Sequence, residues 1–280
     1  MTPIRPHIPR ILIAFDFDRT LATDSVDAVC AVYGVGRDDW DRRHDAALGD
    51  GWDAIVRRGQ ALIALGRARG RPLSKAVCAE AARDHLRLFP GVAGMPDRLR
   101  AVAGEVADGV ALEFVVLSSG YDEIIAETAL AGAFDRILAS GFHAEADGTF
   151  ACVKRIIGHP EKALYLEALG KGADVDGANG PERAGDPVRP DDMHCPFDQM
   201  IYLGDGASDL QAFGFLHRHG GLCLAVGAEG GYAPGQVTDD QRVDAAAPPD
   251  YRPGAPLMAA LEHAVRACAH RIALRAAGPA

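Results

Sequence analysis

The sequence lacks an apolar run long enough to cross a bilayer, and its first ten residues place prolines where a signal peptide has an apolar core. It also lacks an excess of basic residues: 39 acidic residues against 29 basic ones give a formal net charge of −10. A protein that binds nucleic acid needs a basic face to neutralise phosphates. We therefore expect a soluble, cytoplasmic protein with neither a membrane nor nucleic acid as its partner.

Closely spaced cysteine pairs are absent as well. None of the six cysteines forms a C-x-x-C motif, and Cys195, although it follows His194, has no second pair of metal-ligand residues nearby. Disulfide frameworks and structural zinc sites rely on such spacings. We expect six reduced thiols rather than disulfides or a zinc site.

What the sequence does contain is short strand-like runs alternating with helical ones. The chain has 280 residues, enough for one large domain or one domain with a small accessory unit. The predicted strands cover residues 10–16, 112–117, 136–140, 200–203 and 222–226, and a hairpin turns at Asp147-Gly148. Predicted helices cover residues 122–131, 160–169, 208–217 and 256–275. This alternation predicts an α/β protein with a mostly parallel sheet covered on both faces.

Three stretches depart from the alternation. Residues 24–89 are helical throughout and contain no convincing strand, which predicts a small all-helical insert after the first strand. Residues 170–197 are rich in glycine, aspartate and proline, and we expect a long exposed loop there. Residues 228–253 are expected to be irregular.

Polar motifs follow three of the predicted strands. They are Asp16-Phe17-Asp18-Arg19-Thr20, Ser118-Ser119-Gly120 and Gly204-Asp205-Gly206-Ala207-Ser208-Asp209. Ligands of parallel sheets bind beyond the carboxyl ends of the strands. Because all three motifs stand at such ends, the sequence predicts that they form one site.

The acidic residues of these motifs suit phosphoryl transfer. Of the closely spaced Asp16 and Asp18, one can attack phosphorus while the other donates and accepts a proton. Asp205 and Asp209, one helical turn apart, would add two more carboxylates on the same side. Such a cluster is unfavourable without a cation, and Mg²⁺, which prefers oxygen ligands, suits it best. A turn of solvated acids and a helix N-cap are the plainer interpretations.

The remaining residues can hold a phosphate. Ser118 and Ser119, with Gly120 at the start of a helix, can form a cradle for an anion, although helix capping alone would also explain them. Lys162 would bring positive charge to the phosphoryl group and hold Asp16 in place. Thr20 could orient Asp16 or bind phosphate.

Together the motifs resemble the haloacid dehalogenase-like hydrolase superfamily, with D-x-D-x-T as DFDRT, the strand-end serine as VVLSSG, the lysine as HPEKAL and the acidic motif as GDGASD. The helical segment and the G-D-G-x-x-D motif are closest to the phosphoserine-phosphatase-like branch. The resemblance implies a Rossmann-like, doubly wound catalytic core of residues 1–23 and 90–280 with a helical cap of residues 24–89. Dehalogenases lack an acid at the position of Asp18, so the resemblance favours a phosphatase.

The resemblance also implies roles for individual residues. Asp16 would form a phosphoaspartyl intermediate and Asp18 would be the acid/base. Phosphate would be bound by Ser118 and Lys162, and Mg²⁺ by Asp16, Asp205 and the backbone carbonyl of Asp18. From the residues themselves we add Thr20, Ser119 and Gly120 to the expected phosphate site and Asp209 to the expected metal site. The branch carries a substrate-binding glutamate where this chain has Ser25, so the resemblance does not specify phosphoserine.

We therefore expect a magnesium-dependent phosphatase that acts on a small phosphorylated metabolite. A phosphotransferase or phosphomutase would use the same motifs, and a third alternative is a non-catalytic protein that binds phosphorylated ligands. Substrate and oligomeric state stay open. The candidates for binding an acidic substrate are Arg42, Arg43, Arg57 and Arg58, for which an arginine-rich solvated face is the alternative.

Overall fold

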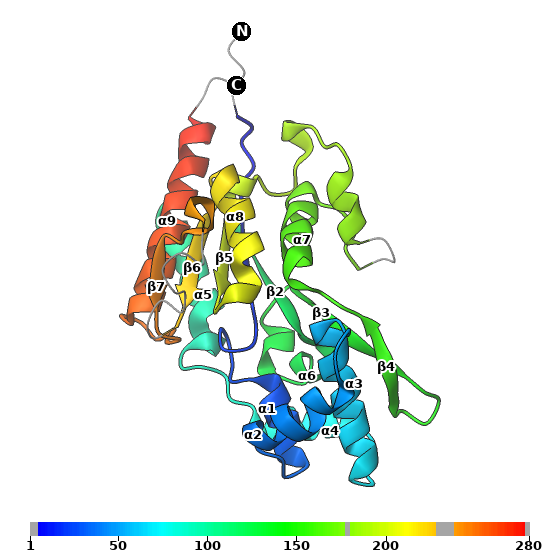
Figure 1. The fold of residues 1–280 in the computed structure, drawn as a ribbon. Helices are drawn as coiled ribbons and strands as arrows, with labels where there is room; N and C mark the ends of the chain where they lie inside the picture. The colour runs from blue at the N-terminus through cyan, green and yellow to red at the C-terminus, as the bar shows by residue number, and fades with distance from the viewer. Residues whose placement is uncertain (1–4, 177–179, 228–237, 278–280) are drawn as a thin grey trace.

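A seven-stranded sheet forms the centre of the protein in the computed structural model, which describes residues 5–176, 180–227 and 238–277 (Figure 1). The strand order is β4-β3-β2-β1-β5-β6-β7, and every neighbouring pair is parallel except β3 and β4. The strands are β1 (Arg10–Phe15), β2 (Ala111–Tyr121), β3 (Arg136–Ala144), β4 (Phe150–Arg155), β5 (Met200–Gly204), β6 (Leu222–Val226) and β7 (Ala245–Ala247). The α/β prediction is confirmed.

Helices cover both faces of this sheet, and short helical turns join several of them. The α-helices are α1 (Ser25–Val32), α2 (Arg37–Trp40), α3 (Ala54–Ala68), α4 (Lys75–Glu80), α5 (Met95–Gly104), α6 (Asp122–Ile125), α7 (His159–Lys171), α8 (Leu210–His219) and α9 (Pro256–Ala276). The shorter turns are Asp41–Asp45, Ala46–Leu48, Ala81–His85, Val92–Gly94, Ala129–Gly132, Pro181–Gly185, Pro190–Asp192, Phe197–Gln199, Ala207–Asp209 and Asp239–Gln241. Among the described residues, no helix combines the length and hydropathy that a membrane span requires.

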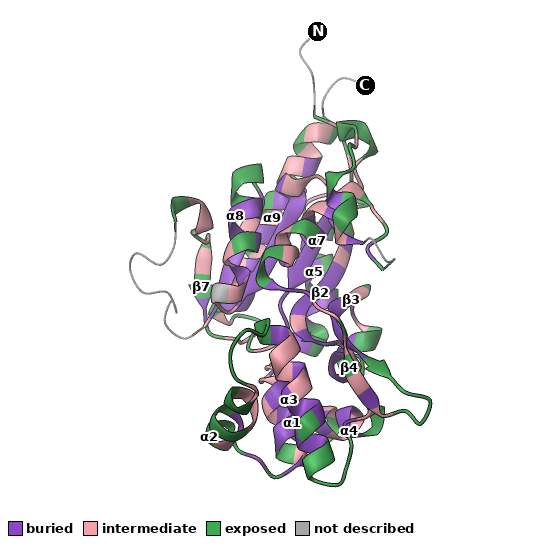
Figure 2. Cartoon of the chain, turned by 45° about the vertical axis from the view of Figure 1, so that its right-hand side comes forward, coloured by how far each residue is buried: buried purple, intermediate pink, exposed green. Residues whose placement is uncertain are grey.

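The alternation of side chains along β1 explains the two layers of helices. Ile11, Ile13 and Phe15 belong to a core with α5 and α9, whereas Leu12 and Ala14 belong to a core with α7 and α8. All five side chains are fully buried. Figure 2 shows the same distribution, with buried residues along the sheet and the inner sides of the helices. Strand β1 lies between β2 and β5, so the strand order changes direction at β1. At such a point a crevice forms beyond the carboxyl end of the strand.

The helical segment 24–89 lies at that carboxyl end, at the bottom of Figure 1. Its two connections to the sheet are hydrogen-bonded to each other: Phe89 N donates to Leu21 O at 2.9 Å, and Thr23 N donates to Arg87 O at 2.9 Å. Within residues 25–89, all of which are described, the structure has helices and no strand of the sheet.

Helix α3 of this segment packs against the end of β2 and against the antiparallel pair of β3 and β4, which forms one edge of the sheet. A methyl group at Gly59 would lie 2.4 Å from Val153 Cγ2 and 2.7 Å from Tyr121 Oη, so only glycine allows this approach. The Tyr121 hydroxyl donates to Ile55 O at 2.6 Å, and its ring stacks on Phe142. The helical segment and the sheet therefore share one hydrophobic core.

Two local predictions are wrong. The helix predicted over residues 122–131 ends at Ile125, because the Thr128 hydroxyl donates to Ile125 O and accepts from Leu130 N, which begins a separate turn. Part of the stretch predicted to be irregular, 228–253, forms β7 and a helical turn, although residues 228–237 lie outside the described part.

The prediction of a long exposed loop over residues 170–197 is confirmed only in part, because the segment is not exposed throughout. Val175, Ala184 and Cys195 are buried against the α7 side of the sheet, and short helical turns divide the segment, of which residues 177–179 lie outside the described part. All six cysteines are free, and all but Cys152 are buried.

Candidate active site

The first part of the site is the turn that follows β1. Asp16 N donates to Leu203 O of β5 at 2.8 Å, which fixes the aspartate between two strand ends. The carbonyl of Phe17 then accepts hydrogen bonds from three successive backbone amides, those of Thr20, Leu21 and Ala22. Arg19 has a positive φ of 58°, a conformation that non-glycine residues rarely adopt. This tight turn places Asp16 and Asp18 beside the cavity described below.

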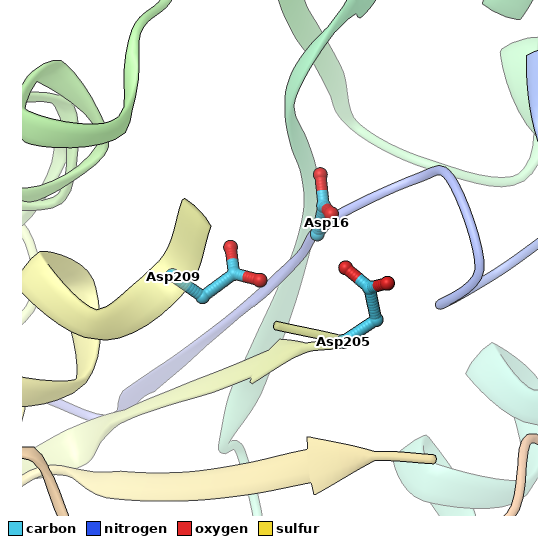
Figure 3. Close-up of side chains that lie close together, drawn as sticks. All are labelled: Asp16, Asp205 and Asp209. Atoms are coloured by element: carbon cyan, nitrogen blue, oxygen red, sulfur yellow. The ribbon is translucent and has the colours of Figure 1, made fainter. Parts of the chain in front are cut away.

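Three carboxylates meet at the ends of β1 and β5 (Figure 3). Asp16, Asp205 and Asp209 each have an oxygen within 4.8 Å of those of the other two. Burial, together with the neighbouring carboxylates, raises the pKa of Asp16 to about 7 and that of Asp205 to about 6, although Lys162 acts in the opposite direction on both. The cluster thus gathers negative charge at a place where water cannot disperse it.

Lys162 from α7 lies beneath this cluster. Its ammonium group is 2.9 Å from Asp16 Oδ1 and 2.7 Å from Asp209 Oδ1, and its side chain has no exposed surface. The two carboxylates raise the pKa of Lys162 in spite of its burial. Lys162 therefore stays charged and fixes one oxygen of Asp16.

Asp209 is held by more partners than any other acid of the cluster. Besides Lys162, its Oδ1 accepts from Tyr202 Oη at 2.6 Å, and its Oδ2 accepts from Gly206 N at 3.2 Å and Ser208 Oγ at 3.3 Å. A methyl group at Gly204 would lie 2.3 Å from its Cγ. Asp209 thus supports the cluster from below, whereas Asp205 lines the cavity.

Asp18 is bound differently. Its Oδ1 accepts from Ser25 N at 2.7 Å and its Oδ2 from Ser25 Oγ at 3.1 Å. Burial, with a contribution from Asp24, raises the pKa of Asp18 to about 6 despite these hydrogen bonds. Ser25 therefore orients Asp18, and Asp24 caps α1 through Val26 N and Asp27 N.

The end of β2 supplies the opposite wall. Ser118 is buried, and its Oγ accepts from Gly120 N at 2.9 Å, so its proton is available for another acceptor. A methyl group at Gly120 would lie 3.0 Å from Asp18 Oδ2 and 3.2 Å from Ser118 Oγ. Glycine thus keeps space open between these two groups. Ser119 also lines the cavity, but its hydroxyl is buried without a partner among the described residues.

Thr20 lies behind the site rather than on its surface. Its side chain is fully buried, its hydroxyl has no partner among the described residues, and it is not part of the cavity wall. Its carbonyl accepts from Tyr251 Oη at 2.9 Å. The structure therefore places Thr20 as a support of the turn after β1.

These groups surround a cavity of about 210 Å³. Its wall consists of Asp16, Asp18, Arg19, Asp24, Arg58, Ser118, Ser119, Gly120, His159, Asp205, Gly206 and Ser208. The motifs at the ends of β1, β2 and β5 are thus brought together, as the sequence predicts. The wall also includes Arg19, which belongs to the first motif, and Arg58, a predicted substrate-binding candidate, whereas Asp24 and His159 were not predicted.

The arginines of the helical segment separate into two kinds. Arg57 pairs with Asp45 through two hydrogen bonds of 3.2 and 2.9 Å, and Arg42 and Arg43 both pair with Asp39. Arg58 lines the cavity, where its charge acts to lower the pKa of Asp18, and within the described part of the chain it has no hydrogen bond or ion pair. It is therefore available to a ligand.

The family of the chain follows from comparison with known proteins. The model of the haloacid dehalogenase-like hydrolase family matches residues 13–214, a range that contains every motif of the site. The chain belongs to this family. Among curated proteins, none matches the sequence.

Solved structures of this hydrolase family resemble the fold. A substrate-bound phosphoserine phosphatase is 16% identical, with a TM-score of 0.55, and the match covers 91% of this chain and 98% of that one. An apo phosphoserine phosphatase is 17% identical, with a TM-score of 0.52 and coverage of 87% and 96%. A family hydrolase from Salmonella enterica subsp. enterica serovar Typhi is 18% identical, with a TM-score of 0.51 and 82% of this chain covered. The match spans 65% of the length of that Salmonella hydrolase.

Proposed function

We propose that this hydrolase is a magnesium-dependent phosphatase that cleaves a small phosphomonoester through a phosphoaspartyl intermediate on Asp16. The observation that carries the proposal is the arrangement of Asp16, with one oxygen fixed by Lys162, at a cavity that it shares with Asp18, Ser118 and Asp205. Nucleophile, acid/base, phosphate cradle and cation ligands then all face one space of about 210 Å³.

In this mechanism Asp16 attacks phosphorus and Asp18 protonates the leaving oxygen. The 2.9 Å contact with Lys162 holds Asp16 in one orientation, so little reorganisation is needed for the attack. The raised pKa of Asp18, about 6, keeps a protonated fraction near neutral pH. Deprotonated after the first step, Asp18 takes a proton from the water that hydrolyses the intermediate.

The donor set fits magnesium. Asp16 and Asp205 offer carboxylate oxygens at the cavity, and the repulsion that raises their pKa values would be relieved by a divalent cation. We propose Asp16, Asp205 and the Asp18 carbonyl as ligands, with Asp209 holding Lys162 and the backbone of the acidic motif. Bound Mg²⁺ would neutralise charge on the phosphoryl group.

The phosphate would lie against the end of β2. The Ser118 hydroxyl and the backbone around Ser119 and Gly120 face the cavity, and the absence of a side chain at Gly120 leaves room for phosphate oxygens. Lys162 contributes positive charge from below. Residues 24–89 would act as a cap over this pocket.

The proposed leaving group is small and carries a negative charge of its own. Arg58 projects from α3 into the cavity with no ion-pair partner in the described part of the chain, whereas Asp24 is already paired with Arg19 and Arg37. An unpaired guanidinium at a partly buried position favours a carboxylate or a second phosphate. The substrate would then be a phosphorylated organic acid.

The reaction is tested by measuring phosphate release from a panel of phosphorylated metabolites with Mg²⁺ and with chelator. Asp16→Asn is expected to lower turnover at least about a thousandfold without changing the fold, because the nucleophile is lost. Asp97→Asn, at a side chain that is 90% exposed, is the matched control and should be fully active. Retained activity in Asp16→Asn would contradict the mechanism, and phosphate transfer to an added alcohol would favour a phosphotransferase.

The role of Arg58 is tested on the same panel. Arg58→Ala is expected to raise KM about tenfold or more for esters with an acidic leaving group and to leave kcat and neutral esters little changed, because ground-state binding is lost. Arg57→Ala, whose guanidinium is bound to Asp45, is the control. Equal effects of the two variants, or of acidic and neutral esters, would contradict this assignment.

A further inference from the structure

A second hollow lies at the opposite end of the sheet from the active site. It has a volume of about 620 Å³ and is lined by Arg5, Asp198, Arg218, His219, Gly220, Arg271, Leu274 and Arg275, which we call the basic cleft. Its walls are the final turns of α8 and α9 and the segment before β5. In Figure 1 these ends of α8 and α9 lie at the top, and the helical segment 24–89 lies at the bottom.

The charge of the basic cleft is opposite to that of the molecule. Four arginines line it, and their carboxylate partners are Asp198, which pairs with both Arg5 and Arg275, and Asp240, which pairs with Arg218. Within the described part of the chain, Arg271 bonds only to the backbone carbonyls of Asp198 and Gly220. The guanidinium charge is therefore only partly balanced, in a protein whose net charge is −10.

The arginines also keep unused hydrogen-bond donors. Among the described residues, Arg271 uses only Nη1 and Arg218 uses only Nη1, which leaves Nη2 and Nε of each without an acceptor. The carbonyls bound by Arg271 hold its side chain in place, so binding a ligand there would cost little side-chain entropy. Fixed cations with spare donors are what an anion with several oxygens requires.

An apolar group stands at the mouth of the basic cleft. Leu274 on α9 is 76% exposed, the most exposed of the large hydrophobic side chains in the described part of the chain. Combined with the arginines, it would suit the carbon skeleton of an organic anion rather than a bare inorganic ion. Without metal the active site is expected to bind such a ligand less well, because four carboxylates line it against two arginines.

We propose that the basic cleft is a binding site for a small multivalent organic anion, a phosphate ester or a polycarboxylate. This site is independent of the proposed phosphatase reaction, since the residues that line it are all distinct from those that line the active-site cavity.

The test is isothermal titration calorimetry of the full, metal-free chain with fructose 1,6-bisphosphate, an organic phosphate ester, and, separately, with citrate. We expect saturable binding of one equivalent that weakens as salt is added. Leu274→Glu, which adds an acid to the mouth of the basic cleft without removing any hydrogen bond, should weaken binding about fivefold or more at low salt. Arg218→Gln should weaken it similarly.

The matched control is Leu164→Glu on α7, because Leu164 is also an exposed leucine, at 43%, and lies outside the basic cleft. It should leave the dissociation constant within about twofold, since a distant exposed charge is screened. Binding of fructose 1,6-bisphosphate alone would assign the site to phosphate esters, and binding of citrate as well would extend it to carboxylates. Absence of saturable binding with both anions, or an equal loss in Leu164→Glu and Leu274→Glu, would overturn the proposal.

Discussion

The ion pairs of Lys162 give the most direct quantitative prediction. Lys162→Met removes a fully buried ammonium group that lies 2.9 Å from Asp16 Oδ1 and 2.7 Å from Asp209 Oδ1. Two buried carboxylates then lose their compensating charge. Breaking a buried pair in this way costs about 3–5 kcal/mol of unfolding free energy.

The assay is urea unfolding of the metal-free protein, followed by circular dichroism. The control is Lys75→Met, which removes a lysine that is 78% exposed and 3.6 Å from Glu127, and it should cost at most about 1 kcal/mol. Asp209→Asn should partly rescue Lys162→Met, because it removes one of the unpaired charges. We expect the double variant to lose at least about 1 kcal/mol less than the sum of the single ones.

Two results would refute this reasoning. If Lys162→Met costs no more than Lys75→Met, the carboxylates do not depend on the buried lysine. If the losses of the single variants at Lys162 and Asp209 simply add, the two side chains are not energetically coupled and the 2.7 Å contact contributes nothing measurable.

Two further predictions concern Gly120 and Glu113. Gly120→Ala places a methyl group 3.0 Å from Asp18 Oδ2. We therefore expect the rate of phosphate release to fall about tenfold or more while the thermal stability stays unchanged. Full activity of this variant would show that the space beside Gly120 is not used in the reaction. His194 Nε2 and Glu113 Oε2 are 2.6 Å apart, and this hydrogen bond lowers the pKa of Glu113. The hydrogen bond should add about 1.5–3 kcal/mol to the unfolding free energy. That stabilisation should be present above the ordinary glutamate pKa and be lost as the pH falls through the lowered pKa. The difference in unfolding free energy between the wild type and Glu113→Gln, measured from pH 7 to pH 3, should therefore shrink towards acid, and a constant difference would contradict it.

The sequence was most informative where local patterns determine structure. Continuous apolar runs indicated β1, β2, β5 and β6, because strands buried on both faces contain few polar residues. The polar motifs at their ends were brought together by the topology of a parallel sheet. Elements that depend on long-range pairing could not be predicted from the sequence. Strand β7 consists of three alanines and is a strand only because it pairs with β6.

The state of individual charged residues also had to come from the structure. Arg57 and Arg58 are adjacent in sequence, yet one is bound to Asp45 and the other lines the cavity, because neighbours on a helix point about 100° apart. Tyr202, which donates to Asp209, lies within an ordinary apolar strand and gives no signal of its own. Likewise, Ser25 stands where the resembled branch has a glutamate, and only the structure shows that its hydroxyl donates to Asp18.

The hydrogen bonds between the two connections of the helical segment have a consequence for how this chain can change. Because Phe89 N and Leu21 O are 2.9 Å apart, the segment leaves and re-enters the sheet at one point, and its length can vary at little cost in loop-closure entropy. The packing of α3 on Tyr121 and Phe142 restricts such changes, because any segment that replaces residues 24–89 must also cover those two rings. The whole inserted segment could thus be exchanged for another one, provided that the new segment carries an apolar face for the ends of β2 and β3.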